Sequence, residues 1–217
     1  MDIAETSVEA MADGTFYFIV RGTEFVKGYG LVGYGPMKRV TDDWYCPLGT
    51  DYPPVFHFTY QDAVREESFT VPVELVKDYV HVRLQFVGFE SFIETGGRFP
   101  FDVVLRGNTC GINGLSGAPL HGDYEYRPVE HMEGCYEFNV PRLADNFLLL
   151  ELYGREAYPE FRGHDRTLDL NGILRAEAGI NWSEKNLPDV QITVDYEEFT
   201  TYVSVSEWGQ SVINYEY

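Results

Sequence analysis

The run GLSGAP, residues 114–119, places Ser116 between two glycines, as a nucleophilic serine is placed in some hydrolases. A nucleophile elbow has the pattern Gly-x-Ser-x-Gly, and Ala118 stands here where the second glycine would be. No strand pattern leads directly into a helix pattern around Ser116. We therefore interpret the run as a turn.

The five histidines of the chain do not form a His-Glu-x-x-His pattern or another close metal-binding spacing. His121 and His131 share one loop-rich region with Asp123 and Glu130, so a metal site there is one interpretation. Ordinary solvent-exposed loop residues are the other interpretation. We expect no metal.

The three cysteines, Cys46, Cys110 and Cys135, show no Cys-x-x-Cys spacing, so the sequence does not predict zinc. Two alternatives stay open for them. They are separate buried thiols, or Cys110 and Cys135 meet across neighbouring strands if the chain is exported.

Two further patterns could support chemistry, but neither is complete. The glycine-rich run GYGLVGYG, residues 28–35, is not followed by a helix that carries Lys or Thr, so it makes no phosphate cradle. With 35 acidic residues, chance carboxylate pairs are certain, and a glycosidase pair must also share one cleft. We therefore predict a protein that is not an enzyme and that uses no cofactor.

The chain is strongly acidic, with 16 Lys and Arg against 35 Asp and Glu and a formal net charge of −19. Such a field repels phosphate backbones, so we expect no nucleic-acid partner. No apolar run approaches the roughly 20 residues of a membrane helix, and we predict no membrane-spanning segment.

The local patterns predict mainly β structure. Aromatic residues make up 16% of the chain, and many short alternating runs are separated by turn residues. In the run YVHVRLQFVGF, residues 79–89, every second residue from Val80 to Phe86 is apolar. This alternation is typical of an antiparallel sheet with one dry face. We predict an antiparallel β-sandwich with one short helix.

The predicted helix lies in the run HDRTLDLNGILRAEAGINW. Leu170, Ile173 and Leu174 have helical spacing, Asp169 can cap the start, and Gly179 can end the last turn. A composition break near residues 65–68 divides the chain into a short N-terminal β section, residues 1–66, and a main β-sandwich, residues 67–217. The first section has too few strands to close a sheet alone, so it is either a partial first domain or a set of strands that add to the main one.

The segment 189–209 is predicted to form a closing hairpin. Its apolar face contains Val190, Ile192, Val194, Val203 and Val205, and Trp208 falls out of phase with them. This change of phase suggests a bulge near Glu207. The face can pack on the opposite sheet of its own domain, or its strand ends and Trp208 can contact a partner.

Four passages resemble the fimbrillin-A-associated anchor family of Bacteroidales. They are FTVPVELVKDYVHVRLQFVG (69–88), YEFNVPRLADNFLLLELYG (136–154), RTLDLNGILRAEAG (166–179) and LPDVQITVDYEEFTTYVSVSEWG (187–209). The resemblance covers about two-thirds of the chain, as patterns of apolar and polar residues with few fixed identities. It implies transthyretin-like β-sandwich domains, export to the outer membrane by lipid attachment, and a part in anchoring or capping a pilus.

These observations give two functional hypotheses. The first is a non-enzymatic cell-surface fimbrial accessory or anchor protein that meets other fimbrial subunits by strand addition, with its signal and lipidation site outside this chain. The alternative is a glycan-binding surface module, since aromatic faces stack on sugars. Its candidate contacts are Tyr29, Tyr34, Trp44, Tyr124 and Tyr126.

Overall fold

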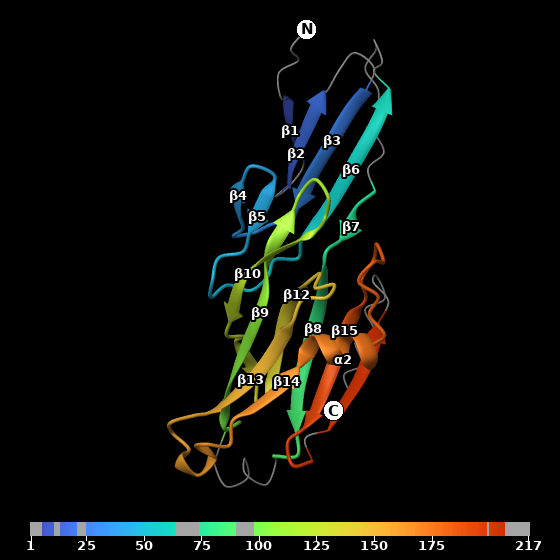
Figure 1. Cartoon of the computed structure of the whole chain (residues 1–217). Coiled ribbons are helices and arrows are strands. Elements are labelled where there is room, and N and C mark those ends of the chain that lie inside the picture. Colours follow the sequence, from blue (N-terminus) through green and yellow to red (C-terminus); the bar gives the residue numbers. More distant parts are fainter. Residues whose placement is uncertain are drawn as a thin grey trace.

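The computed structural model describes residues 6–10, 14–20, 25–63, 74–89, 98–198 and 200–206. These residues form strands in three sheets, one short α-helix and one turn of 3-10 helix (Figure 1). In chain order the elements are β1 Thr6–Ala10, β2 Gly14–Val20, β3 Phe25–Val32, β4 Lys38–Val40, β5 Asp43–Tyr45, β6 Phe56–Ala63, β7 Val76–Lys77, β8 Tyr79–Val87, β9 Phe101–Asn113, β10 Pro119–Tyr126, β11 Glu130–Met132, β12 Cys135–Pro141, β13 Leu148–Gly154, η1 Pro159–Phe161, β14 Arg166–Asp169, α2 Leu170–Ala176, β15 Asp189–Asp195 and β16 Thr201–Ser206.

Two of the sheets form a sandwich. One has the order β14-β13-β9-β5-β4, with β10 also paired to β9, and the second has the order β11-β12-β8-β15-β16. All described strand pairs are antiparallel except β15, which runs parallel to β8. The prediction of a mainly β antiparallel sandwich with one short helix is confirmed.

The interior between these sheets is filled by the alternate residues of their strands. Along β8, Val80, Val82, Leu84 and Phe86 are buried, as the alternation predicts. Phe86 stacks on Phe99 with ring centroids 4.5 Å apart. Burying a side chain of this size stabilises the fold by about 1.5–3 kcal/mol.

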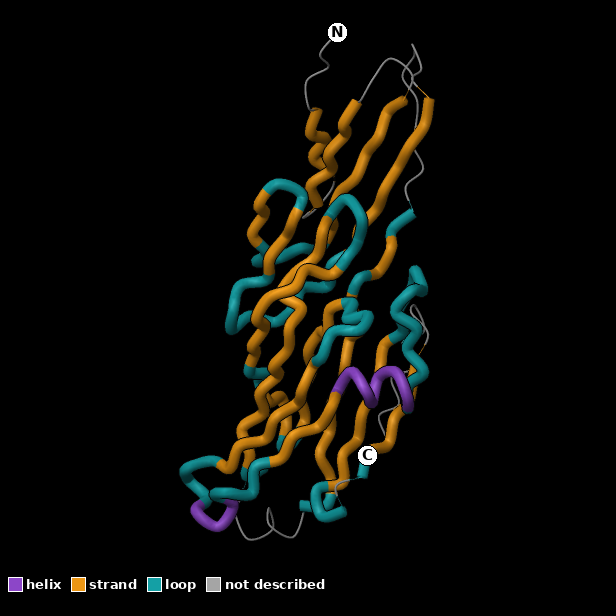
Figure 2. The backbone as a smooth tube through the Cα atoms, viewed as in Figure 1, coloured by secondary structure: helices purple, strands orange, loops and turns teal. Residues whose placement is uncertain are grey.

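The third sheet, β1-β2-β3-β6-β7, is built from the N-terminal part of the chain and extends from one end of the sandwich (Figure 1). The β4–β5 hairpin leaves this sheet and joins β9 of the sandwich, with Trp44 opposite Ile112. Figure 2 shows the strands of both parts following the long direction of the molecule. The predicted boundary at residue 66 lies outside the described residues and stays a prediction, and the β5–β9 pairing crosses it.

Helix α2 begins at the predicted residue, after Asp169, and ends at Ala176, shortly before the predicted Gly179. The Asp169 side chain caps it by accepting a hydrogen bond from the Gly172 backbone N–H at 3.0 Å. A Cβ at position 172 would come within 2.6 Å of this carboxylate, so the glycine that lowers helix propensity also makes room for the cap. Gly179, with φ of +67°, turns the chain after the helix. Leu170, Ile173 and Leu174 are buried.

The predicted closing hairpin is formed by β15 and β16, with β16 outermost. Val190 lies opposite Val205 and Ile192 lies opposite Val203, so the predicted apolar residues share one face. Trp208 and the bulge expected near Glu207 lie outside the described residues.

Candidate functional site

Strand β16 forms an outer edge of its sheet, because in the described part of the chain it pairs only with β15. Its sequence, TYVSVS, contains no charged residue. The other described edge strands each carry at least one: β1, β4, β7, β10, β11 and β14. Charged side chains on an edge strand hinder pairing with another chain. The β16 edge is therefore the least protected of the edges that the structure describes.

The side chains of β16 are open to a partner. Tyr202 is 61% exposed and Val205 is 47% exposed, while Val203 is half-buried and packs against the core. The opposing residues of β15 (Val190, Ile192 and Val194) are buried. The predicted contact set therefore divides into three core residues, a half-buried Val203 and an exposed Val205, while Trp208 lies outside the described residues.

The hairpin is fixed in place at its turn. Asp195 Oδ1 accepts hydrogen bonds from the backbone N–H groups of Glu197 and Glu198, both at 2.9 Å, and so closes the turn. Thr201 Oγ1 donates to the Glu177 carboxylate beyond the end of α2 at 2.8 Å. An edge held in this way needs little ordering before another strand pairs with it.

Three of the five aromatic side chains predicted to contact glycans are buried: Tyr29, Trp44 and Tyr124. The indole of Trp44 is covered by Tyr34, with ring centroids 4.5 Å apart. Tyr29 donates a hydrogen bond to Asp42. Burial is the larger cause and this hydrogen bond the next, and together they raise the pKa of Tyr29 to about 12. Rings enclosed in this way offer no face to a sugar. Tyr34 and Tyr126 are half-buried and keep part of their surface accessible.

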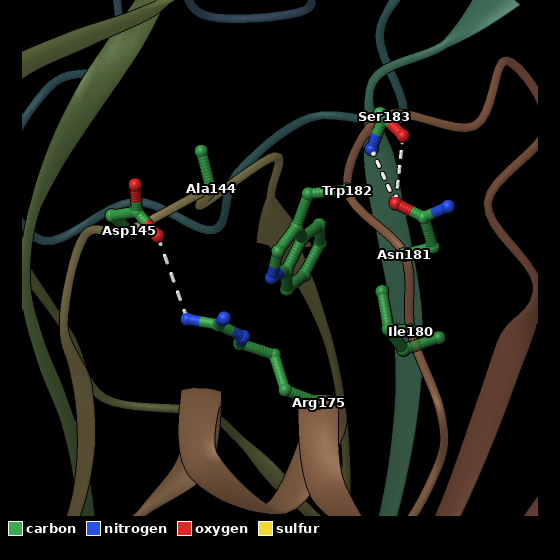
Figure 3. A pocket seen from close by; sticks show the side chains of 7 residues that line it. All are labelled: Ala144, Asp145, Arg175, Ile180, Asn181, Trp182 and Ser183. Carbon is green, nitrogen blue, oxygen red and sulfur yellow. Dashed lines mark hydrogen bonds and ion pairs between the residues drawn. The ribbon is translucent and has the colours of Figure 1, made fainter.

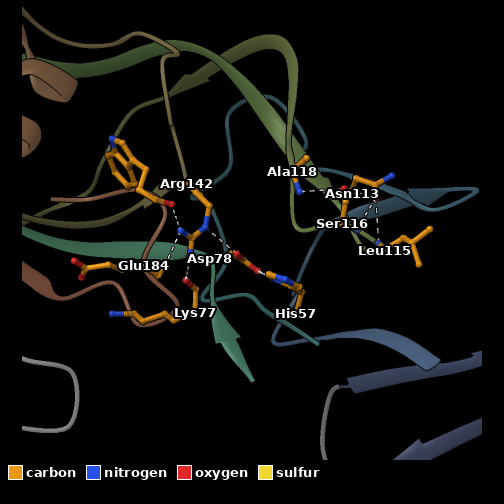
Figure 4. Close-up of polar contacts among 10 residues, drawn as sticks. His57, Lys77, Asp78, Asn113, Leu115, Ser116, Ala118, Arg142 and Glu184 are labelled. Carbon is orange, nitrogen blue, oxygen red and sulfur yellow. Dashed lines mark hydrogen bonds and ion pairs between the residues drawn. The ribbon is translucent and has the colours of Figure 1, made fainter. Parts of the chain in front are cut away.

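A buried polar network connects the N-terminal sheet to the sandwich (Figure 4). Asp78, which is fully buried, contacts His57 Nδ1 through one carboxylate oxygen and Arg142 Nε through the other, at 3.1 Å. Arg142 also donates to the carbonyl oxygens of Lys77, at 2.8 Å, Glu184, at 2.9 Å, and Trp182. The guanidinium therefore holds three segments that are far apart in the sequence.

An aspartate–histidine pair is part of many hydrolase sites, but this pair is closely enclosed. Ser116 lies in a turn, as predicted, and its Oγ donates to Asn113 Oδ1 at 2.8 Å. The neighbouring Gly117 packs on the His57 ring, where an added Cβ would lie within 2.6 Å of Nε2. The histidine is thus enclosed between Asp78 and a backbone turn.

The cysteines are all free in this structure, and Cys46 and Cys110 are buried. Burial raises the pKa of each of the three thiols above the ordinary value, so they are weak nucleophiles at neutral pH. His121 and His131 lie exposed on β10 and β11. Within the described ranges, no three His, Cys, Asp or Glu side chains are grouped so that they could hold a metal ion. No helix in those ranges has the length and apolar character of a membrane span.

The fold occurs in other solved structures. No protein-family model and no curated protein matches the chain. A Bacteroides thetaiotaomicron structure described as a polysaccharide-binding protein (DUF1812) matches with a TM-score of 0.60 and 13% identity, over 88% of this chain and 77% of the other.

Two further structures match over a similar span. One, from Bacteroides thetaiotaomicron, is described as an adhesin, with a TM-score of 0.52 and 12% identity over 85% of this chain and 76% of the other. The fimbrial anchor protein Mfa2 from Porphyromonas gingivalis has a TM-score of 0.52 and 11% identity over 86% and 76%. At these identities the likeness shows a shared fold.

The sequence did not reveal the buried polar network. It also did not reveal that β16 is the described edge strand without a charged residue. The first depends on residues up to 127 positions apart, from His57 to Glu184, which no local pattern connects. The second had a visible signal, the charge-free run TYVSVS in a chain that is 24% charged. That signal becomes meaningful only when the strand is known to lie at an edge.

Proposed function

We propose that this protein is a non-enzymatic, exported cell-surface protein that acts as an adhesion or fimbrial accessory subunit. The shared fold with an anchor protein and with a structure described as an adhesin supports this proposal. The enclosed histidine and the high pKa of the thiols also support a role in contact and not in chemistry. Attachment to the outer membrane by a lipid is part of the proposal and rests on the resemblance of the sequence alone.

The observation that carries the proposal is the β16 edge. A strand from another subunit can pair with the backbone groups of β16 that no described strand pairs, and place apolar side chains beside Val203 and Val205. Each fully buried apolar side chain would stabilise such a joint by about 1.5–3 kcal/mol. The partner in this proposal is another fimbrial subunit, joined by strand addition.

Cross-linking in cells tests the proposal. A photoreactive amino acid in place of Tyr202 should form a covalent product with a fimbrial subunit, identified by mass spectrometry. Val205→Lys should abolish that product, because a charged side chain on the edge strand hinders pairing with another strand. The matched control is Met132→Lys on β11, the opposite edge of the same sheet, where the side chain is 71% exposed. Equal cross-linking in both variants would contradict the assignment of β16.

A second candidate function is glycan binding at the cell surface. The match to the structure described as a polysaccharide-binding protein supports it, as does the partial exposure of Tyr34 and Tyr126. Binding to a glycan array that is lost in both Tyr34→Ala and Tyr126→Ala would favour this function at those rings. Binding that survives both changes would exclude them as the contact site.

A further inference from the structure

The backbone groups that β16 directs toward an incoming strand follow from its register with β15. The Asp195 N–H donates to the Thr200 carbonyl oxygen at 2.9 Å, so these two residues face each other as a hydrogen-bonded pair. Along an antiparallel ladder such pairs alternate with pairs that are not hydrogen-bonded, and the register of β15 with β16 shows no shift. The N–H and C=O groups that point away from β15 are therefore those of Thr201, Val203 and Val205.

The two faces of β16 differ in chemistry. Val203 lies opposite Ile192, and its side chain continues the apolar face of β15. Tyr202 points to the other face and is 61% exposed. An added strand therefore needs apolar residues at every second position, beside Val203, and polar residues between them.

The end of this edge beside the hairpin turn is acidic. Asp195, Glu197 and Glu198 belong to the turn, and the two glutamates are exposed. The Glu177 carboxylate accepts a hydrogen bond from the Oγ1 of Thr201, the first residue of β16, at 2.8 Å. Within the described ranges, none of these four carboxylates forms an ion pair with a lysine, arginine or histidine side chain.

Two arginines lie close to these carboxylates in the sequence or in the fold. Arg175 of α2 faces Asp145, with 3.5 Å between guanidinium Nη1 and carboxylate Oδ1, as Figure 3 shows. Its charge is therefore already balanced by another acid. Arg166 lies near the turn: burial raises the pKa of Tyr196, and Arg166 partly opposes that rise. Four carboxylates against this one arginine give the turn end a net negative charge.

A strand with positive charge at the matching end would complement this field. Antiparallel pairs are commoner than parallel ones, and an antiparallel strand would bring its C-terminal end beside Thr201. We propose that the strand added to β16 comes from a partner subunit, runs antiparallel to β16, and carries lysine or arginine at its C-terminal end. A second copy of this chain does not fit, because a net charge of −19 repels a like molecule. This inference rests on the proposed function and specifies the partner strand.

Synthetic peptides test the inference by fluorescence polarisation. Each peptide has blocked ends and a core of alternating valine and threonine. The first adds a pair of lysines at the C-terminal end, the second a pair of glutamates there, and the third a pair of lysines at the N-terminal end. At low ionic strength we expect the first to bind about tenfold more tightly than either of the others, because the turn carboxylates attract its lysines. This preference should shrink in about 1 M salt, which screens exposed charges.

The double variant Glu197→Gln with Glu198→Gln should abolish the preference. Both changes keep the backbone N–H groups that close the turn, so thermal unfolding should match the wild type. The matched control is Asp123→Asn with Glu184→Gln, which also removes a pair of exposed carboxylates. It should keep the preference, because its positions lie in β10 and in the loop before β15.

The inference is overturned if no peptide binds, if all three bind equally, or if the second or third binds most tightly. It is also overturned if the turn variant keeps the preference, or if the control variant loses it as fully, because net charge alone would then explain it. The Tyr202 cross-link tests the proposed function separately. A cross-link to a fimbrial subunit, together with peptides that do not discriminate, would overturn the partner chemistry and leave strand addition standing, whereas no cross-link would remove both.

Discussion

Arg142 meets Asp78 inside the protein, with 3.1 Å between guanidinium Nε and carboxylate Oδ1 and with Asp78 fully shielded from water. The same aspartate contacts His57 of the N-terminal sheet. The pair therefore lies where the N-terminal sheet, the end of β12 and the loop before β15 converge (Figure 4). Removing one member would leave the other as an uncompensated buried charge.

Arg142→Met should accordingly destabilise the protein by about 3–5 kcal/mol, because Asp78 would lose its cationic partner in a buried site. Three backbone carbonyls would also lose a donor. Urea unfolding followed by circular dichroism measures this change. Arg83→Met is the control, since Arg83 forms an exposed 2.9 Å pair with Glu137 across β8 and β12. Exposed pairs contribute about 0–1 kcal/mol, so equal losses in the two variants would refute the role of the buried network.

The close approach of Gly117 to His57 gives a second prediction. Gly117 has a φ of +69°, and an added Cβ would overlap the imidazole ring. Gly117→Ala should therefore cost about 1–2 kcal/mol for the left-handed conformation and about 1–3 kcal/mol more for the overlap.

Gly163→Ala isolates the conformational part of that cost. Gly163 also has a positive φ, +79°, but a Cβ there would meet nothing within 4 Å. Thermal unfolding of both variants should show a clearly larger loss for Gly117→Ala. Equal losses would mean that the turn does not press on the histidine.

The elements that follow a short local rule were predictable from the sequence. The dry face of β8 needs only alternation, and α2 needs only a capping aspartate, helical spacing and Gly179. The joining of β5 to β9 was not predictable, because it depends on residues more than 60 positions apart. The parallel pairing of β15 with β8 has the same cause.

The burial of the candidate site residues also depends on distant strand pairing, which a local sequence pattern does not show. Val190 and Val205 have identical side chains on one face, and sequence alone gives no reason to separate them. Only the position of β16 at the edge leaves Val205 exposed while Val190 is covered. Trp44 likewise sits in a run of turn residues that suggests exposure, yet the β5–β9 pairing carries it into the core.

Asp51 makes stability depend on pH. Burial raises the pKa of its carboxyl group to about 6, although a hydrogen bond from the Asn139 backbone N–H at 3.1 Å partly opposes the shift. The folded state then holds this proton more tightly than the unfolded state, whose carboxyl has an ordinary pKa near 4. The contribution is thus fully present below about pH 4 and is lost as pH rises through about 6.

Comparison with Asp51→Asn separates this effect from those of the other carboxylates. Asparagine keeps an oxygen that can accept the Asn139 N–H, but it does not titrate. The stability difference between variant and wild type should shift by about 2 kcal/mol in favour of the variant between pH 4 and pH 7, allowing for partial solvent screening. Chemical denaturation at each pH measures it. A constant difference across this range would contradict the raised pKa.

The two strands of the closing hairpin should respond differently to truncation. Ile192 is buried on β15, so Ile192→Ala should cost about 2–5 kcal/mol through lost burial and a cavity. Val205 is on the exposed edge, so Val205→Ala should change stability by no more than about 0.5 kcal/mol. Denaturant midpoints of the two variants and the wild type, measured side by side, give the two stability losses. A large loss in Val205→Ala would show that the outer strand belongs to the core of its own domain, and it would remove the free edge on which strand addition depends.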